Sequence, residues 1–205
     1  MKLLLFSDLH TDTRAARSLV ERAADEGIDV LVGAGDFGSV RRDVRACVDV
    51  LRALTLPAIL VAGNNETTDE LVAACRDWPT AHVLHGNGAE IAGRTFFGLG
   101  GGVPVTPFGA WSYDFTEDEA AALLDPCPAG CVLVSHSPPK GAVDLDSRGR
   151  SHGSTAVRAA ILRNHPVLVV CGHIHASAGQ AATIGPTPVV NAGPEGIVWE
   201  IPEPR

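Results

Sequence analysis

The sequence has little of what a membrane protein, a secreted protein or a nucleic-acid-binding protein needs. No apolar run approaches the roughly 20 residues of a membrane span, and the apolar start of the chain ends at Asp8 and His10, too soon for the core of a signal peptide. Lys and Arg number 16 against 24 Asp and Glu, for a net charge of −8. We therefore expect neither membrane insertion nor stable binding of nucleic acid through a basic surface.

Cysteine is also scarce, and several catalytic motifs are absent. The five cysteines are odd in number and include no Cys-x-x-Cys pair, which favours a reduced, cytoplasmic setting. The glycine-rich stretch from Gly98 to Gly102 is not followed by the Lys-Ser/Thr of a nucleotide-binding P-loop. No Gly-x-Ser-x-Gly surrounds His136, so a serine-hydrolase triad is not supported.

The length of 205 residues fits one domain, residues 1–205, with a substantial core. Uninterrupted apolar runs predict strands that are covered on both faces, at residues 3–6, 30–32, 58–62, 132–134 and 167–171. Apolar stripes predict helices over Thr13–Glu26 and Arg41–Leu54, so the chain begins with parallel β-α-β-α-β units. Asp12 or Thr11 is expected to cap the first helix.

The rest of the chain predicts a second sheet. Short strand-like pieces with glycine turns fill His82–Gly102 and recur over Thr183–Ile201, and two more helical patterns cover Glu117–Leu124 and Thr155–Arg163. Thr67 followed by Glu70 matches a helix capping box. Two sheets with helices outside are the simplest arrangement of these elements.

Potential metal ligands follow each of the five apolar runs. They are Asp8, His10, Asp36, Asn64, His136, His173 and His175. Because ligands gather at the carboxyl ends of parallel strands, we expect these side chains to converge on one rim. Nitrogen and oxygen donors without thiolate suit Mn foremost, with Fe, Zn, Ni or Mg as other candidates. Seven ligands exceed the needs of one such ion, so we expect two divalent ions that share an aspartate.

The motifs Asp8-x-His10, Gly35-Asp36, Gly63-Asn64, His136 and Gly172-His173-x-His175, in this order, resemble the signature of the calcineurin-like metallophosphoesterases. The resemblance implies a two-sheet α/β/β/α sandwich. It also implies that Asp8, His10 and His175 bind one metal ion, that Asn64, His136 and His173 bind the other, and that Asp36 bridges them.

One position departs from the family pattern. The third motif usually reads Gly-Asn-His-Asp/Glu, and here Asn65 replaces the histidine that protonates the leaving oxygen or stabilises the transition state in phosphomonoesterases. Asn65 can donate a hydrogen bond but cannot supply a proton at neutral pH. Small bacterial and archaeal members that lack this histidine resemble phosphodiesterases.

These observations predict a phosphodiesterase that acts on a small phosphoester, with Asp36 and Asn65 in catalytic positions and a metal-bridging hydroxide as nucleophile. A phosphomonoesterase or nucleotidase is the first alternative. A non-catalytic interaction module with the same fold is the second, although a scaffold has no need of seven converging ligands. The sequence does not determine the oligomeric state.

Two irregular segments are candidates for substrate contacts. The segment Pro138–His152 follows His136 and carries cations, among which we expect Arg148 and His152 to contact the substrate. A solvated surface loop is about equally compatible with this composition. The aromatic segment Trp111–Phe115 could flank an aromatic group of the substrate or simply pack.

Overall fold

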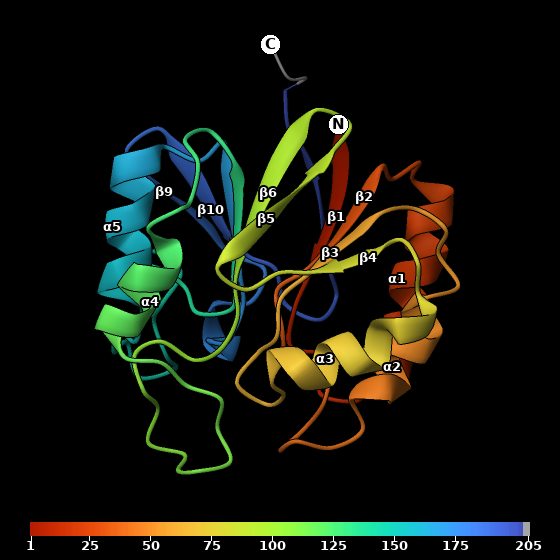
Figure 1. The fold of residues 1–205 in the computed structure, drawn as a ribbon, viewed down its shortest axis with the longest axis horizontal. Helices are drawn as coiled ribbons and strands as arrows, with labels where there is room; N and C mark the ends of the chain where they lie inside the picture. Colours follow the sequence, from red (N-terminus) through yellow and green to blue (C-terminus); the bar gives the residue numbers. More distant parts are fainter. Residues whose placement is uncertain (203–205) are drawn as a thin grey trace.

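The computed structural model describes residues 1–202 as two β-sheets packed face to face, with helices on both outer faces (Figure 1). The strand order is β11-β1-β2-β3-β4 in the first sheet and β5-β6-β7-β8-β10-β9 in the second. Strands β1 to β4 run parallel, as do β6, β7, β8 and β10, while β11, β5 and β9 are antiparallel edge strands. This arrangement confirms the α/β/β/α sandwich expected from the sequence.

The strands and helices alternate in the first half of the chain. The strands of the first sheet are β1 (Lys2–Phe6), β2 (Val30–Gly33), β3 (Ala58–Leu60), β4 (Ala81–Val83) and β11 (Ile197–Glu200). The helices against this sheet are α1 (Thr13–Asp25), α2 (Val44–Leu51) and α3 (Thr68–Ala74). They lie on the right in Figure 1.

The second half of the chain builds the other sheet and its covering helices. Its strands are β5 (Asn87–Ile91), β6 (Arg94–Leu99), β7 (Val132–Ser135), β8 (Leu168–Cys171), β9 (Ala181–Ile184) and β10 (Thr187–Asn191). Helices α4 (Glu117–Leu124) and α5 (Thr155–Asn164) pack on its outer face, on the left in Figure 1.

Strand β1 shows why the predicted strands are apolar throughout. Leu3 and Leu5 point into the core between the two sheets, whereas Leu4 and Phe6 point into the core under the helices. Since successive side chains of a strand face opposite sides, a strand inside four layers needs apolar residues at every position. Full burial of each such side chain contributes about 1.5–3 kcal/mol.

The second helix begins later than the sequence pattern predicts. Helix α2 covers only Val44–Leu51, because Val40, Arg41 and Asp43 adopt positive φ angles that a helix cannot contain. The expected caps are present. Asp12 accepts hydrogen bonds from the first turn of α1, and Thr67 forms a capping box with Glu70 at the start of α3.

Membrane-spanning helices and paired cysteines were not expected from the sequence. Over residues 1–202, no helix combines the length and apolar character required to cross a membrane. All five cysteines are free and buried.

Candidate metal centre

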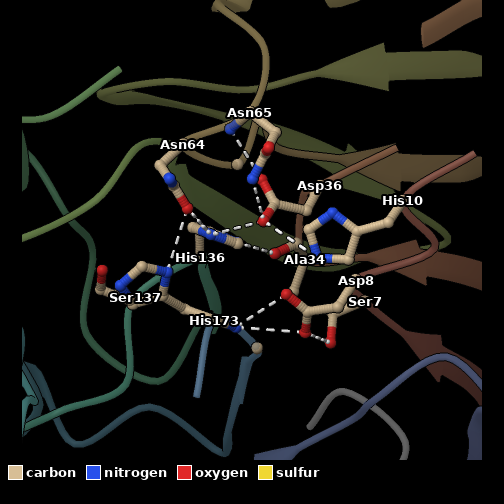
Figure 2. Close-up of polar contacts among 12 residues, drawn as sticks. Ser7, Asp8, His10, Ala34, Asp36, Asn64, Asn65, His136, Ser137 and His173 are labelled. Atoms are coloured by element: carbon tan, nitrogen blue, oxygen red, sulfur yellow. Dashed lines mark hydrogen bonds and ion pairs between the residues drawn. The ribbon is translucent and has the colours of Figure 1, made fainter. Parts of the chain in front are cut away.

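Five loops at the carboxyl ends of parallel strands converge on one site. They follow β1, β2, β3, β7 and β8, and they carry all seven expected ligands: Asp8, His10, Asp36, Asn64, His136, His173 and His175. Because neighbouring parallel strands end at the same edge of each sheet, the sandwich brings these loops together from distant parts of the sequence. Figure 2 shows most of these side chains pointing toward a common centre.

Asp8, His10 and His175 form one group of potential ligands. Their donor atoms all lie within 4.8 Å of one another. The Nε2 atoms of His10 and His175 are 3.0 Å apart, and His175 Nε2 is 3.7 Å from Asp8 Oδ1. Asp8 is buried, whereas the His175 side chain is 64% exposed, so this group lies at the mouth of the site.

Asn64, His136 and His173 form a second group, deeper in the site. The side-chain oxygen of Asn64 lies 3.2 Å from His136 Nε2 and 3.1 Å from His173 Nδ1 (Figure 2). The other ring nitrogen of His136, Nδ1, is 2.8 Å from the carbonyl oxygen of Ala34. That contact holds the ring orientation and leaves Nε2 directed at the centre.

Asp36 lies between the two groups. Its Oδ2 atom is 3.5 Å from His10 Nε2 and 3.6 Å from His136 Nε2. Asp36 and His136 also form a cluster with Asp8 whose donor atoms lie within 4.8 Å of one another. A carboxylate in this position has geometry suited to contact ions on both sides.

The electrostatics of these residues fit bound cations. Burial and the neighbouring Asp8 raise the pKa of Asp36 to about 8, because little positive charge from the protein compensates this carboxylate. Burial lowers the pKa of His10, and burial together with His136 lowers the pKa of His173, so both rings stay neutral. Neutral imidazoles and carboxylates are the forms that bind metal ions, and the donor set therefore fits divalent cations.

Glycines make room for these side chains. A Cβ atom on Gly63 would collide with the carboxylate of Asp36, and one on Gly35 would lie 2.6 Å from His136 Nδ1. Gly35 also has a φ of +96°, a turn that glycine makes most readily, whereas Gly63 is not among the residues with positive φ. Close approach, rather than a turn, therefore explains the glycine at position 63.

The backbone of the site is strained at four candidate ligands. Asp8, His10, Asp36 and His173 have φ angles of +57°, +43°, +59° and +67°. Left-handed conformations of non-glycine residues cost about 1–3 kcal/mol each and are concentrated at functional sites. This strain is expected where a fold positions side chains for chemistry rather than for stability.

Glu66 organises the site without being a candidate ligand, and no pattern in the sequence assigned it a role. Its fully buried carboxylate accepts hydrogen bonds from the backbone N–H groups of Asp36, Phe37, Gly38 and Gly63, at 2.8–3.3 Å. These bonds tie the loop after β2 to the loop after β3. The only signal in the sequence that could have identified Glu66 is its place in the third motif, three residues after Gly63.

Asn65 contacts the central aspartate. Its backbone N–H and its side-chain Nδ2 each donate to Asp36, both at 2.8 Å, and its Oδ1 accepts from the N–H of Val40 (Figure 2). Asn65 also lines the cavity above the site. The structure thus places Asn65 at the centre, where it orients Asp36.

The cavity above the candidate ligands has a volume of about 700 Å³. His152 lines it together with Lys140 and Arg150, and the contact of His152 with a substrate stays a prediction. Arg148 is exposed and is not among the lining residues, so the expectation of a contact by Arg148 is not supported by its position. Arg150 turns toward the site instead, because Asp146 holds both Arg150 and His152 at 2.8–3.0 Å.

The family can be stated from comparison with known proteins. A model of the calcineurin-like phosphoesterase superfamily domain matches residues 1–202. The chain belongs to this superfamily. Among curated proteins, none matches the sequence.

Several solved structures share the fold at low identity. A Thermus thermophilus protein is 20% identical with a TM-score of 0.75, over 94% of this chain and 88% of its own. A dimetal phosphatase from Danio rerio is 13% identical with a TM-score of 0.63, over 93% and 86%. An archaeal phosphodiesterase is 18% identical with a TM-score of 0.58, over 94% and 84%.

Proposed function

We propose that this superfamily member is a dinuclear metal-dependent phosphodiesterase for small phosphoesters. The observation that carries the proposal is the position of Asp36 between two groups of imidazole, carboxylate and amide donors. Asp8, His10 and His175 would hold one ion, Asn64, His136 and His173 the other, and Asp36 both, with Mn as the first candidate metal. Divalent ions in such a site lower the pKa of bound water and neutralise charge on phosphoryl oxygens.

The residues of the chain have distinct parts in this reaction. Two hydrogen bonds from Asn65 orient Asp36. Asn65 also lines the cavity, so the site has an amide at the position where phosphomonoesterases carry their general acid. An amide cannot protonate a leaving oxygen, so the site favours diesters with good leaving groups over alkyl monoesters. The amide at position 65 therefore supports the diesterase assignment over the phosphomonoesterase alternative.

Metal titration of an Asp36 variant tests the dinuclear site. Wild-type protein stripped with chelator should take up two Mn ions per chain by calorimetry and elemental analysis. Asp36→Asn should weaken both binding events together and lower the hydrolysis of a diester by several orders of magnitude, since one carboxylate serves both ions. Asp29→Asn, at a surface carboxylate that accepts from Lys2, is the matched control.

The results separate the alternatives. Binding of one ion only, with Asp36→Asn unchanged in affinity, would contradict the dinuclear proposal. Two bound ions with faster turnover of monoesters than of diesters would favour the phosphomonoesterase alternative. Two bound ions with no hydrolysis across monoesters, linear diesters and cyclic nucleotides would favour a non-catalytic role.

A further inference from the structure

The cavity above the metal ligands has one apolar wall that the proposed chemistry does not explain. The loop between β6 and α4 supplies it, through Pro104, Val105, Pro107, Phe108 and Trp111. Val105 is 59% exposed and Phe108 52%, so neither side chain serves mainly to fill a core. Exposed apolar residues that share a cavity with catalytic groups are typical of a ligand site.

The two aromatic residues of this wall are stacked on each other. The ring centroids of Phe108 and Trp111 are 5.7 Å apart, and the ring planes differ by only 15°. The outer face of a ring in a stacked pair is a flat apolar surface. Another flat ring can be added to such a surface in the offset geometry that aromatic pairs prefer.

A hydrogen-bond network holds the wall in place. Asp114 accepts from the N–H and hydroxyl of Thr106, at 2.9 and 2.6 Å, and from the hydroxyl of Ser112 at 2.8 Å. Ser112 in turn accepts from Nδ2 of Asn64 at 2.9 Å. The loop that carries the aromatic pair is therefore fastened to a candidate metal ligand, which fixes its distance from the reacting centre.

A second part of the cavity lining is polar and already paired. Arg150 and His152 both contact Asp146, and Nζ of Lys140 donates to the carbonyl of Ser151 at 3.3 Å. Internal pairing lowers the capacity of these groups to recognise a substrate charge. The unpartnered recognition surface of the cavity is thus the apolar one.

We propose that Phe108 and Trp111 form a subsite that binds a flat aromatic substituent of the phosphoester. The inference rests on the proposed function and deepens it, because it names the class of ester group that the site selects. The phosphoryl group lies at the ligand cluster, and its aromatic substituent lies on the Phe108–Trp111 surface of the same cavity. The substrate class is therefore aryl or heteroaryl phosphoesters rather than alkyl phosphoesters.

Binding of unreactive phosphonates to Mn-loaded protein tests the subsite without turnover. Phenylphosphonate, cyclohexylphosphonate and methylphosphonate carry the same head group, and calorimetry gives their dissociation constants. Phenylphosphonate should bind about 10-fold more tightly than methylphosphonate, and more tightly than cyclohexylphosphonate, because aromatic stacking adds to apolar burial. Trp111→Ala and Phe108→Ala should remove most of this advantage and leave methylphosphonate affinity within about 2-fold of the wild type.

Leu162→Ala is the matched control, since it truncates an apolar side chain of similar exposure, 50%, on helix α5. It should leave all three affinities unchanged. Mn stoichiometry and circular dichroism of each variant report that the fold and the metal centre are intact.

The outcomes distinguish this inference from the proposal on which it rests. Equal affinities of wild-type protein for phenylphosphonate and methylphosphonate would overturn the subsite and leave the phosphoesterase proposal standing. Equal affinities for phenylphosphonate and cyclohexylphosphonate would overturn the aromatic selection. Failure of the Mn-loaded protein to bind any of the three would overturn the proposed function, and the subsite with it.

Discussion

At the scale of single residues, the proposed function assigns the choice of ester class to Asn65. Asn65→His introduces a group that can protonate a leaving oxygen, and general acids contribute typically about 100 to 10,000-fold. We expect the ratio of kcat/KM for an alkyl monoester to that for a diester to rise at least about 10-fold. Steady-state kinetics on the two substrates with equal Mn occupancy measures this ratio.

Asn65→Ala is the control for that experiment. It removes the hydrogen bond to Asp36 without adding an acid, so kcat/KM should fall for both substrates and the ratio should stay near that of the wild type. A wild-type preference for monoesters that Asn65→His leaves unchanged would show that the role given to Asn65 is wrong.

Ser112 is the second residue with a testable role, because it contacts the candidate ligand Asn64 and should thereby affect metal affinity. Its hydroxyl accepts from Asn64 Nδ2 and so keeps Oδ1 directed at the two histidines. Partners of this kind are worth about 10–100-fold in metal affinity. Ser112→Ala should weaken one of the two Mn binding events by about 10-fold and leave the other nearly unchanged.

Calorimetric Mn titration checks this expectation, with Ser147→Ala as the control. Ser147 lies in the polar part of the same cavity lining. It takes no part in the hydrogen bond between Ser112 and Asn64. Equal loss of affinity in both variants, or in both binding events of Ser112→Ala, would contradict a specific action through Asn64.

At the scale of secondary structure elements, Glu117 joins α4 to α5. Its carboxylate accepts from the N–H groups of Thr155 and Ala156 and from the Ser154 hydroxyl, at 2.7–2.9 Å. Burial alone would raise the pKa of Glu117, but these hydrogen bonds at the start of α5 outweigh it and lower the pKa. A lowered pKa means that the ionised form stabilises the folded state.

The resulting stability depends on pH in a defined direction. The contribution of Glu117 is present above the pKa of an unfolded Glu, about 4.3, and is lost as the pH falls through the lower folded value. Glu117→Gln should therefore reduce the free energy of unfolding by about 1 kcal/mol at pH 7 and by less below pH 4. Urea unfolding at both pH values measures the difference.

Asp118→Asn controls for the charge of the α4 N-terminus. Asp118 lies in the same turn and is exposed, so its substitution should cost at most about 0.5 kcal/mol. A cost of Glu117→Gln that stays constant down to pH 3 would show that packing, not the ionised carboxylate, joins the two helices.

At the scale of the whole molecule, the candidate metal centre connects both sheets. The loops after β1, β2 and β3 belong to the first sheet, and those after β7 and β8 belong to the second. Ions bound to the folded state alone stabilise it by about 2.7 kcal/mol per site at 100 times the dissociation constant. For a chain of this size, each kcal/mol of stabilisation raises Tm by about 2–4 °C. Two saturated sites should therefore raise Tm by about 10 °C or more.

Thermal scans of chelated protein with increasing Mn measure that shift, and Asp36→Asn should lose most of it. Calcium is a useful comparison, because a donor set with four imidazoles is a poor match for this oxygen-preferring ion. A Tm that is independent of Mn would contradict metal binding to the folded state.

The sequence by itself determined the layers of the fold and identified the candidate ligands. A parallel strand inside four layers must be apolar on both faces, so runs such as Leu3–Phe6 were identifiable without neighbours. The carboxylate and imidazole side chains that follow such a run, Asp8 and His10 or His173 and His175, had to emerge at the rim of the sheets. Local rules also identified the cap at Thr67 and narrowed the cap of the first helix to Asp12 or Thr11, because a cap involves only the first turn of its own helix.

Only the tertiary structure decided how the loops contact one another. Glu66 and Asn65 bind the loop after β2, some 30 residues earlier, and Asn64 reaches Ser112 across the site. Asp146 selects Arg150 rather than Arg148 for the cavity, and Phe108 stacks on Trp111. Such contacts follow from the relative positions of loops with no periodic pattern, and no local regularity of the sequence encodes those positions.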